Sequence, residues 1–300
     1  MDINFILLVI AALAPAIILC TYIFIKDRQE KEPFGLLIKL LLFGVLSVVP
    51  VLIIGEFLGE FIDEIFSSYY IPSITGDKVF SDPNIRAAYL LVYFMIAVAL
   101  VEEGCKYFFM YLPTRKNKEF NSLFDGIIYA VFVSLGFAAF ENVLYVTENG
   151  FGNAIMRALL SVPGHMFYGV MMGYYYSMVH IYDKAKEYEQ KFIQKGLIPP
   201  GRAGFDSKQM KIKSLAVPVA AHGIYDFLCM LGSSWSVLAL LAFVIYMYIH
   251  CFKKVIKMSK ADKSDTNCVA QLLFRKYPDL PEKLRAASEQ AENSETQEKI

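Results

Sequence analysis

The sequence predicts an all-α fold, a polytopic bundle of about seven transmembrane helices. Of its 300 residues, 56% are hydrophobic and the mean hydropathy is +0.43, whereas soluble domains are about 45–50% apolar. Seven apolar runs come close to the roughly 20 residues that a helix needs to span the hydrocarbon core. These runs cover residues 5–25, 34–58, 87–112, 123–147, 155–181, 214–231 and 234–252.

The basic residues between the runs predict the orientation of the bundle. If the runs alternate in direction, 24 Lys and Arg residues lie on one side of the membrane and three on the other. Basic loops stay in the cytoplasm, so we expect the N-terminus outside and the C-terminus inside. We therefore expect a multi-pass protein of the cell membrane.

Several runs have features that refine their boundaries. The run 5–25 has no basic segment before it and no small-residue cleavage motif after it, so we expect a retained span rather than a signal peptide. The second run continues as GEFIDEIF (59–66), an amphipathic pattern that predicts a helix projecting beyond the membrane. The fifth run continues as DKAKEYEQKF (183–192), which predicts that its helix extends into the cytosol.

Composition divides the chain into two parts. Residues 1–258 form the predicted membrane domain, and residues 259–300 are charged and polar with few apolar anchors. Such a composition favours disorder, so we expect a disordered cytoplasmic tail with a short helix near 266–275.

Three charged residues interrupt the third apolar run. Glu102, Glu103 and Lys106 lie within EEGCK, in the middle of residues 87–112. Charges at that depth are costly, and those that occur face a protein interior or a water-filled cavity, where they serve function. Glu102 and Glu103 point about 100° apart on a helix, so we expect only one of them to face a bound water.

Further polar groups occur at similar depth in the neighbouring runs. His222 and Asp226 are spaced i, i+4 and share a helix face. His222 lies roughly 12 Å and Glu103 roughly 15 Å from the cytoplasmic ends of their helices. His165 follows Pro163, which predicts a kink in the fifth run.

These groups have the chemistry of a hydrolytic site. A carboxylate such as Glu102 or Glu103 can deprotonate a water for attack on a peptide carbonyl, with help from His165. His222, together with Asp226, can stabilise the developing oxyanion. Alternatively, His165, His222 and Glu103 could bind zinc, which needs about three protein ligands at a catalytic site, although no HExxH motif is present.

Three other polar residues are supporting candidates. Glu141 and Asn142 lie at a depth similar to His165, and a purely structural hydrogen-bonding role is an alternative for both. Asp125 starts the fourth run, where an acidic side chain also suits the helix dipole.

Four blocks in order resemble the PrsW family of intramembrane proteases, relatives of the CAAX prenyl endopeptidases and bacterial self-immunity proteins. The resemblance covers about residues 87–231. The blocks are EEGCK (102–106), FDGIIYAVFVSLGFAAFEN (124–142), HMFYGVMMG (165–173) and HGIYD (222–226).

The resemblance implies cleavage of single-pass membrane proteins, notably anti-sigma factors, with catalysis by the paired glutamates and the two histidines. The CAAX endopeptidases have an asparagine four residues after the last histidine, where this chain has Asp226. The resemblance leaves both a glutamate and a zinc mechanism open.

Two other classes of function also place Glu and His within spans. A proton-coupled transporter usually has internal repeats, which the sequence lacks. A non-enzymatic immunity or scaffold protein would tolerate alanine at the glutamates and histidines. We expect the lipid bilayer and an anti-sigma-factor-like membrane protein as partners, and no nucleic acid.

Overall fold

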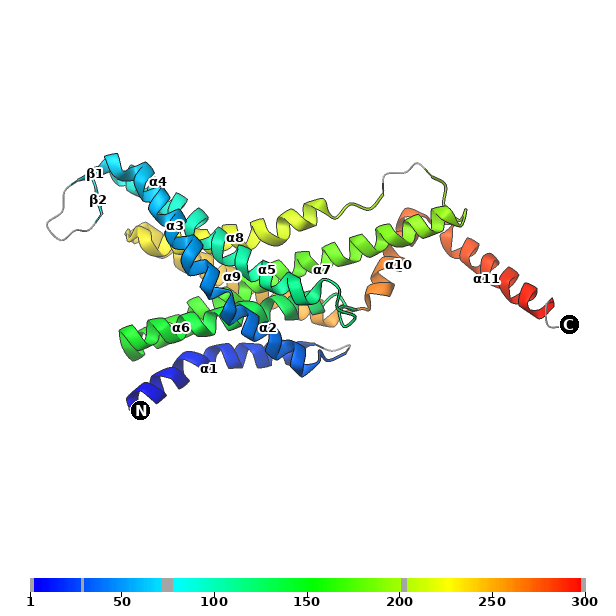
Figure 1. Ribbon diagram of the computed structural model, residues 1–300, viewed down its shortest axis with the longest axis horizontal. Coiled ribbons are helices and arrows are strands. Elements are labelled where there is room, and N and C mark those ends of the chain that lie inside the picture. Colours follow the sequence, from blue (N-terminus) through cyan, green and yellow to red (C-terminus); the bar gives the residue numbers. More distant parts are fainter. Residues whose placement is uncertain (1–2, 28–29, 72–77, 201–203, 298–300) are drawn as a thin grey trace.

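The computed structural model describes residues 3–27, 30–71, 78–200 and 204–297 of this all-α membrane protein. A short antiparallel hairpin of β1 (Tyr70–Ile71) and β2 (Val79–Phe80) lies at one end of the bundle, and the last two helices lie at the other (Figure 1). The helices are α1 (Ile3–Lys26), α2 (Phe34–Leu46), α3 (Val48–Phe66), the 3-10 turn η1 (Ser67–Tyr69), α4 (Pro83–Tyr93), the π-helix η2 (Phe94–Leu100), α5 (Val101–Thr114), α6 (Asp125–Leu159), α7 (Ser161–Gln194), α8 (Lys208–Leu231), α9 (Ser234–Lys260), α10 (Asp265–Lys276) and α11 (Leu280–Gln297).

The described residues contain six helical segments that are long and apolar enough to cross a membrane, whereas the sequence predicts about seven spans. The longest segment, 125–194, consists of α6 and α7. These two helices are antiparallel, because Gly126 packs on Gly173 and Glu141 contacts His165. Each is about 50 Å long at 1.5 Å per residue, so the pair is long enough to cross twice.

The α6–α7 hairpin is the centre of the bundle (Figure 1). Residues 125–139 of α6 and 162–173 of α7 are buried throughout. The other spans bury one stripe and expose many large apolar side chains, as lipid-facing helices do. The hairpin therefore provides an interior in which polar groups are kept away from lipid.

Close packing within the hairpin depends on glycine. A Cβ atom added at Gly173 would lie 2.2 Å from the Gly126 carbonyl oxygen, which belongs to backbone that is itself packed. We expect Gly173→Ala to force the two helices apart and to destabilise the protein by about 1–3 kcal/mol. A thermal unfolding measurement in detergent checks this, with Gly35→Ala as control because a Cβ there meets nothing within 4 Å. Equal stability of the two variants would contradict the packing argument.

Irregular backbone interrupts three of the spans. The predicted run 34–58 bends at Ser47 between α2 and α3, and α3 then continues to Phe66, as the amphipathic pattern predicts. The π-helix η2 immediately precedes α5, the helix that carries Glu102, and Gly150 has a positive φ of 77° inside α6. A π-helix shifts the register of the side chains that follow it, and such segments are frequent at functional sites.

The C-terminal tail differs from the predicted disorder. The short helix expected near 266–275 is present as α10, and α11 follows it. Val269 and Leu273 of α10 are buried against Ile181 and Ala185 of α7, and Asp265 pairs with Lys184. The few apolar residues of the tail occur at helical spacing, and α7 extends beyond the bundle to receive them, which is why composition alone underestimates the order.

Candidate active site

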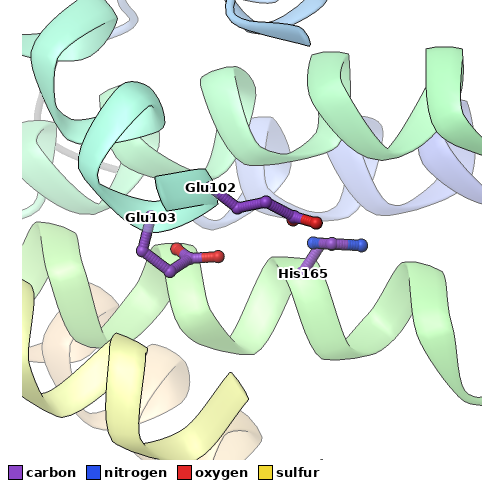
Figure 2. Close-up of side chains that lie close together, drawn as sticks. All are labelled: Glu102, Glu103 and His165. Atoms are coloured by element: carbon purple, nitrogen blue, oxygen red, sulfur yellow. The ribbon is translucent and has the colours of Figure 1, made fainter. Parts of the chain in front are cut away.

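Lys106 lies at the centre of the polar cluster. Its Nζ is 2.9 Å from Glu102 Oε2 and 2.8 Å from Glu103 Oε1, and both carboxylates are on the same helix, α5. The third neighbour is His165 Nδ1 of α7, at 3.1 Å. In Figure 2 the carboxylates of Glu102 and Glu103 both point toward the His165 ring. Lys106 and Glu103 are fully buried, so this ammonium compensates two carboxylates away from water.

Both ring nitrogens of His165 have partners. Because Nδ1 accepts a hydrogen bond from the Lys106 ammonium, the proton of the neutral ring is on Nε2. Nε2 donates to Glu141 Oε2 at 2.9 Å. The two bonds fix the tautomer and the orientation of the ring.

His222 lies between two carboxylates. Its Nδ1 is 3.0 Å from Glu103 Oε1, and its Nε2 is 3.2 Å from Asp226 Oδ2. Only a doubly protonated imidazolium donates from both nitrogens, so this geometry favours the cationic ring. Tyr168 stacks on the ring at 4.7 Å between centroids and holds its plane.

Glu141 is held by an arginine that the sequence reasoning missed. Arg157 Nη2 lies 3.1 Å from Glu141 Oε2, and Arg157 Nε donates to Asn142 Oδ1 at 2.8 Å. Asn142 in turn donates to the Ala12 carbonyl oxygen, which links α1 to the site. Arg157 is one of the three basic residues that the alternating spans place on the outer side of the membrane. Its signal in the sequence is that it stands alone in the apolar stretch NAIMRALL.

A cavity of about 470 Å³ opens beside these groups. Among the described residues, its polar lining includes Glu102, Glu141, His165, His222, Asp226 and Arg157. Glu103 is not part of this lining, and its Oε2 is buried with no hydrogen-bond partner among the described residues. Of the two adjacent glutamates, Glu102 is thus the one that reaches the cavity.

Comparison with known proteins identifies the family. Residues 32–251 match the model described as "PrsW family intramembrane metalloprotease". The chain belongs to the PrsW family. Proteins named "Protease PrsW" from Geobacillus kaustophilus and Halalkalibacterium halodurans are 31% and 30% identical to it. These alignments cover 76% and 85% of this chain and 82% and 99% of the relatives. The Bacillus subtilis Protease PrsW is 28% identical, over 82% of this chain and 93% of its own length. No solved structure matches the chain.

Family membership makes this protein an intramembrane protease, and it shows that the resemblance in the four sequence blocks is correct. The helix bundle brings the four PrsW blocks together. One residue of each block lines the same cavity: Glu102 of α5, Glu141 of α6, His165 of α7 and His222 of α8. Their meeting place is what the depths in the sequence predict.

The family's description names a metalloprotease, which raises the question of whether the site of this PrsW protein can hold a metal ion. One ligand atom each of Glu102, Glu103 and His165 lie within 4.8 Å of one another, a set that could hold a metal ion. Lys106 Nζ is already within 2.8–3.1 Å of an atom of each of these residues. Zinc ligands lie about 2.0–2.2 Å from the metal, so a metal ion would need the position of the ammonium group.

The predicted zinc set of His165, His222 and Glu103 meets a second obstacle. A zinc ligand nitrogen needs a free lone pair, but both nitrogens of each histidine are engaged, and His222 faces a carboxylate on either side. As arranged, the residues do not fit a metal ion.

Asp125 lies apart from the active-site cavity of the PrsW protein. Its carboxylate accepts hydrogen bonds from the backbone N–H groups of Asn121 and Ser122 and from the Ser122 hydroxyl. These bonds fix the loop that leads into α6, and Asp125 lies in the first turn of α6, where an acidic side chain suits the helix dipole. It also faces a second group of carboxylates, at the junction of α1, α2 and α9.

This junction makes the stability of the protein depend on pH. Burial, with a contribution from the charge of Asp125, raises the pKa of Glu32 to about 9. Burial likewise raises the pKa of Asp27 and of Asp262 to about 6. The folded protein keeps protons that the unfolded chain releases above about pH 4, so these groups reduce stability as pH rises from about 4 to 6, and Glu32 continues to do so up to about 9.

We expect Glu32→Gln to raise the melting temperature more at pH 8 than at pH 5, because the amide never carries the charge that is costly to bury. Melting of wild type and variant across this pH range measures the difference directly. A difference that does not change with pH would contradict the assignment to Glu32.

Proposed function

We propose that this protein hydrolyses a peptide bond in or near a transmembrane segment of another protein of the cell membrane, using a water activated by Glu102. The observation that carries the proposal is the position of Glu102. Its Oε2 is bound by the Lys106 ammonium, and the residue lines the cavity beside His222. The ammonium holds the carboxylate at the edge of the cavity, where it can accept a proton from a bound water, as a general base must.

The reaction uses Glu102 as base and then as acid. Glu102 takes a proton from water, the hydroxide forms a bond with the carbonyl carbon, and the carbonyl oxygen becomes an oxyanion. When the C–N bond breaks, Glu102 gives the proton to the departing amine. Each proton is returned, so the site is restored after release of the two products.

His222 is the proposed oxyanion donor: its Nε2–H pairs with Asp226 Oδ2 at 3.2 Å in the free protein, and this hydrogen bond passes to the substrate oxygen as negative charge develops there. Its Nε2 lies 3.9 Å from Glu102 Oε2, so one carbonyl group can contact both a water held by Glu102 and this nitrogen. Asp226 and Glu103 keep the ring protonated, and Tyr168 keeps its plane fixed. A preorganised charged donor is effective in a site shielded from bulk water.

His165, Glu141 and Arg157 act as positioning residues. His165 of α7 contacts the Lys106 ammonium, and Arg157 fixes Glu141, which orients His165. In this proposal His165 acts on the base indirectly, by holding the Lys106 ammonium that binds the Glu102 carboxylate.

The proposed substrate is a single-pass membrane protein of the anti-sigma-factor type. Its support is the family resemblance and the position of the cavity, whose wall includes apolar side chains such as Phe94, Met156 and Met230. A substrate segment that has unwound from its transmembrane helix can enter such a cavity from the bilayer. A transporter would not require a water-activating carboxylate beside an oxyanion donor.

Metal removal tests this mechanism. We expect the purified protein to cleave a fluorogenic peptide based on a single-pass anti-sigma factor at an unchanged rate after dialysis against a tight chelator, because Lys106 supplies the positive charge. Mass spectrometry of the products locates the cleaved bond. Loss of cleavage that added zinc restores would refute the glutamate mechanism, while intramembrane proteolysis itself would stand.

A further inference from the structure

A second cavity, of about 410 Å³, lies between α7 and α9 and shares no lining residue with the active-site cavity. Aromatic and basic side chains make up most of its wall: Tyr174, Tyr246, His250, Lys253, Lys254 and Lys257. Apart from Tyr174 on α7, all of these are in the last turns of α9.

The positive charge of this cavity is not neutralised by the protein. Within the described residues, no carboxylate lies within ion-pairing distance of Lys253, Lys254 or Lys257. Lys254 Nζ instead lies 3.5 Å from the centroid of the Tyr174 ring, so the ring face holds the half-buried lysine in place. The cavity thus presents three ammonium groups to which an anion can bind.

The surroundings specify what kind of anion fits. Ile249 lies one helical turn before Lys253, and Ile245 lies two turns before it. They expose 51% and 58% of their surface, as lipid-facing residues of a membrane helix do. The apolar surface changes to a basic one at about His250, on the side that we expect to face the cytoplasm. At this level of a bilayer, the phosphate groups of the lipid are found.

We propose that the cavity binds the phosphate headgroup of an anionic phospholipid, with Lys253, Lys254 and Lys257 as donors to the phosphate oxygens. One acyl chain then lies along Ile245 and Ile249. A soluble anion would use the lysines alone and leave this adjoining apolar surface unused, which is why the proposal commits to a lipid. It rests on membrane insertion and not on the proposed catalytic mechanism.

The test compares lipid binding by two variants that have the same net charge. One carries Lys253→Gln, Lys254→Gln and Lys257→Gln. The control carries Lys116→Gln, Lys118→Gln and Lys195→Gln, three exposed lysines on the same predicted side of the membrane but outside the cavity. Each protein is purified in detergent and titrated with phosphatidylglycerol, phosphatidylcholine or inorganic phosphate. Native mass spectrometry counts the bound lipids, and the melting temperature reports their effect.

We expect wild type and control to retain one phosphatidylglycerol and to melt at higher temperature with it. We expect about fivefold weaker binding for each cavity lysine removed and about a hundredfold for all three. Equal binding of phosphatidylcholine, or full stabilisation by inorganic phosphate alone, would overturn the assignment to an anionic lipid. Unchanged phosphatidylglycerol binding by the cavity variant would overturn the site.

A second variant guards against misfolding. Because Lys254 packs on Tyr174, its removal perturbs the contact between α7 and α9, whereas Lys257 packs on no aromatic ring among the described residues. Lys257→Gln alone should fold and bind phosphatidylglycerol about fivefold more weakly. Wild-type affinity of this single variant would contradict a direct contact between Lys257 and the phosphate.

Discussion

Replacing Glu102 by glutamine is expected to lower kcat for peptide cleavage by about three orders of magnitude, with little change in KM. The amide has the size of the carboxylate and still accepts a hydrogen bond from Lys106, but it takes no proton from water. Loss of a general base costs about 10²- to 10⁴-fold in rate. Because the substrate segment is bound by the rest of the cavity wall, its affinity should remain.

Glu103→Gln is the matched control, since the two residues are adjacent on α5 and share Lys106. Glu103 lies outside the lining of the cavity, and its contacts are to Lys106 and to His222. We expect this variant to melt at lower temperature and to keep a larger share of activity than Glu102→Gln. The rate at which each variant cleaves a fluorogenic transmembrane peptide compares the two. A larger loss of kcat in Glu103→Gln than in Glu102→Gln would mean that Glu103, and not Glu102, is the base.

The sequence predicts which charged residues come together because the physical signal is strong. Charged groups within apolar runs are costly unless they meet partners, so Glu102, Glu103, Lys106 and His222 had to face one another or water. Helical spacing gives their depth along each span, and the structure brings them together as those depths indicate.

The sequence does not predict how each helix is rotated about its axis, or which side chains pair across the bundle. Which glutamate reaches the cavity depends on the orientation of α5 after the π-helix η2, and no local pattern fixes that angle. Arg157 was missed because its contact with Glu141 spans a bend at Gly150, where the positive φ redirects the chain. In the tail, the order of α10 depends on a surface that α7 provides from far away in the sequence.

The arrangement around Lys106 also explains how one buried cation serves both stability and chemistry. Lys106 compensates Glu102 and Glu103, and Glu103 in turn faces His222, whose other nitrogen faces Asp226. Positive and negative groups alternate along this chain, so each charge has an opposite neighbour. The base and the oxyanion donor are thus coupled through Glu103.

Lys106→Met is consequently expected to damage folding as well as catalysis. Methionine fills much of the volume of lysine, yet it leaves two buried carboxylates with one imidazolium between them. Removing one partner of a buried ion pair costs about 3–5 kcal/mol. We expect a lower melting temperature, less protein inserted in the membrane, and no cleavage, because Glu102 loses the hydrogen bond that positions its carboxylate at the cavity.

The double variant Lys106→Met with Glu103→Gln separates the two effects. Removing the charge of Glu103 takes away one of the uncompensated carboxylates, so the melting temperature should recover part of the loss, while cleavage should stay absent because Glu102 still lacks its ammonium. Melting temperature and cleavage rate of the four proteins form a double-mutant cycle. If the losses in stability were simply additive, Lys106 and Glu103 would not interact, and recovery of cleavage in the double variant would mean that the ammonium is not needed to position Glu102.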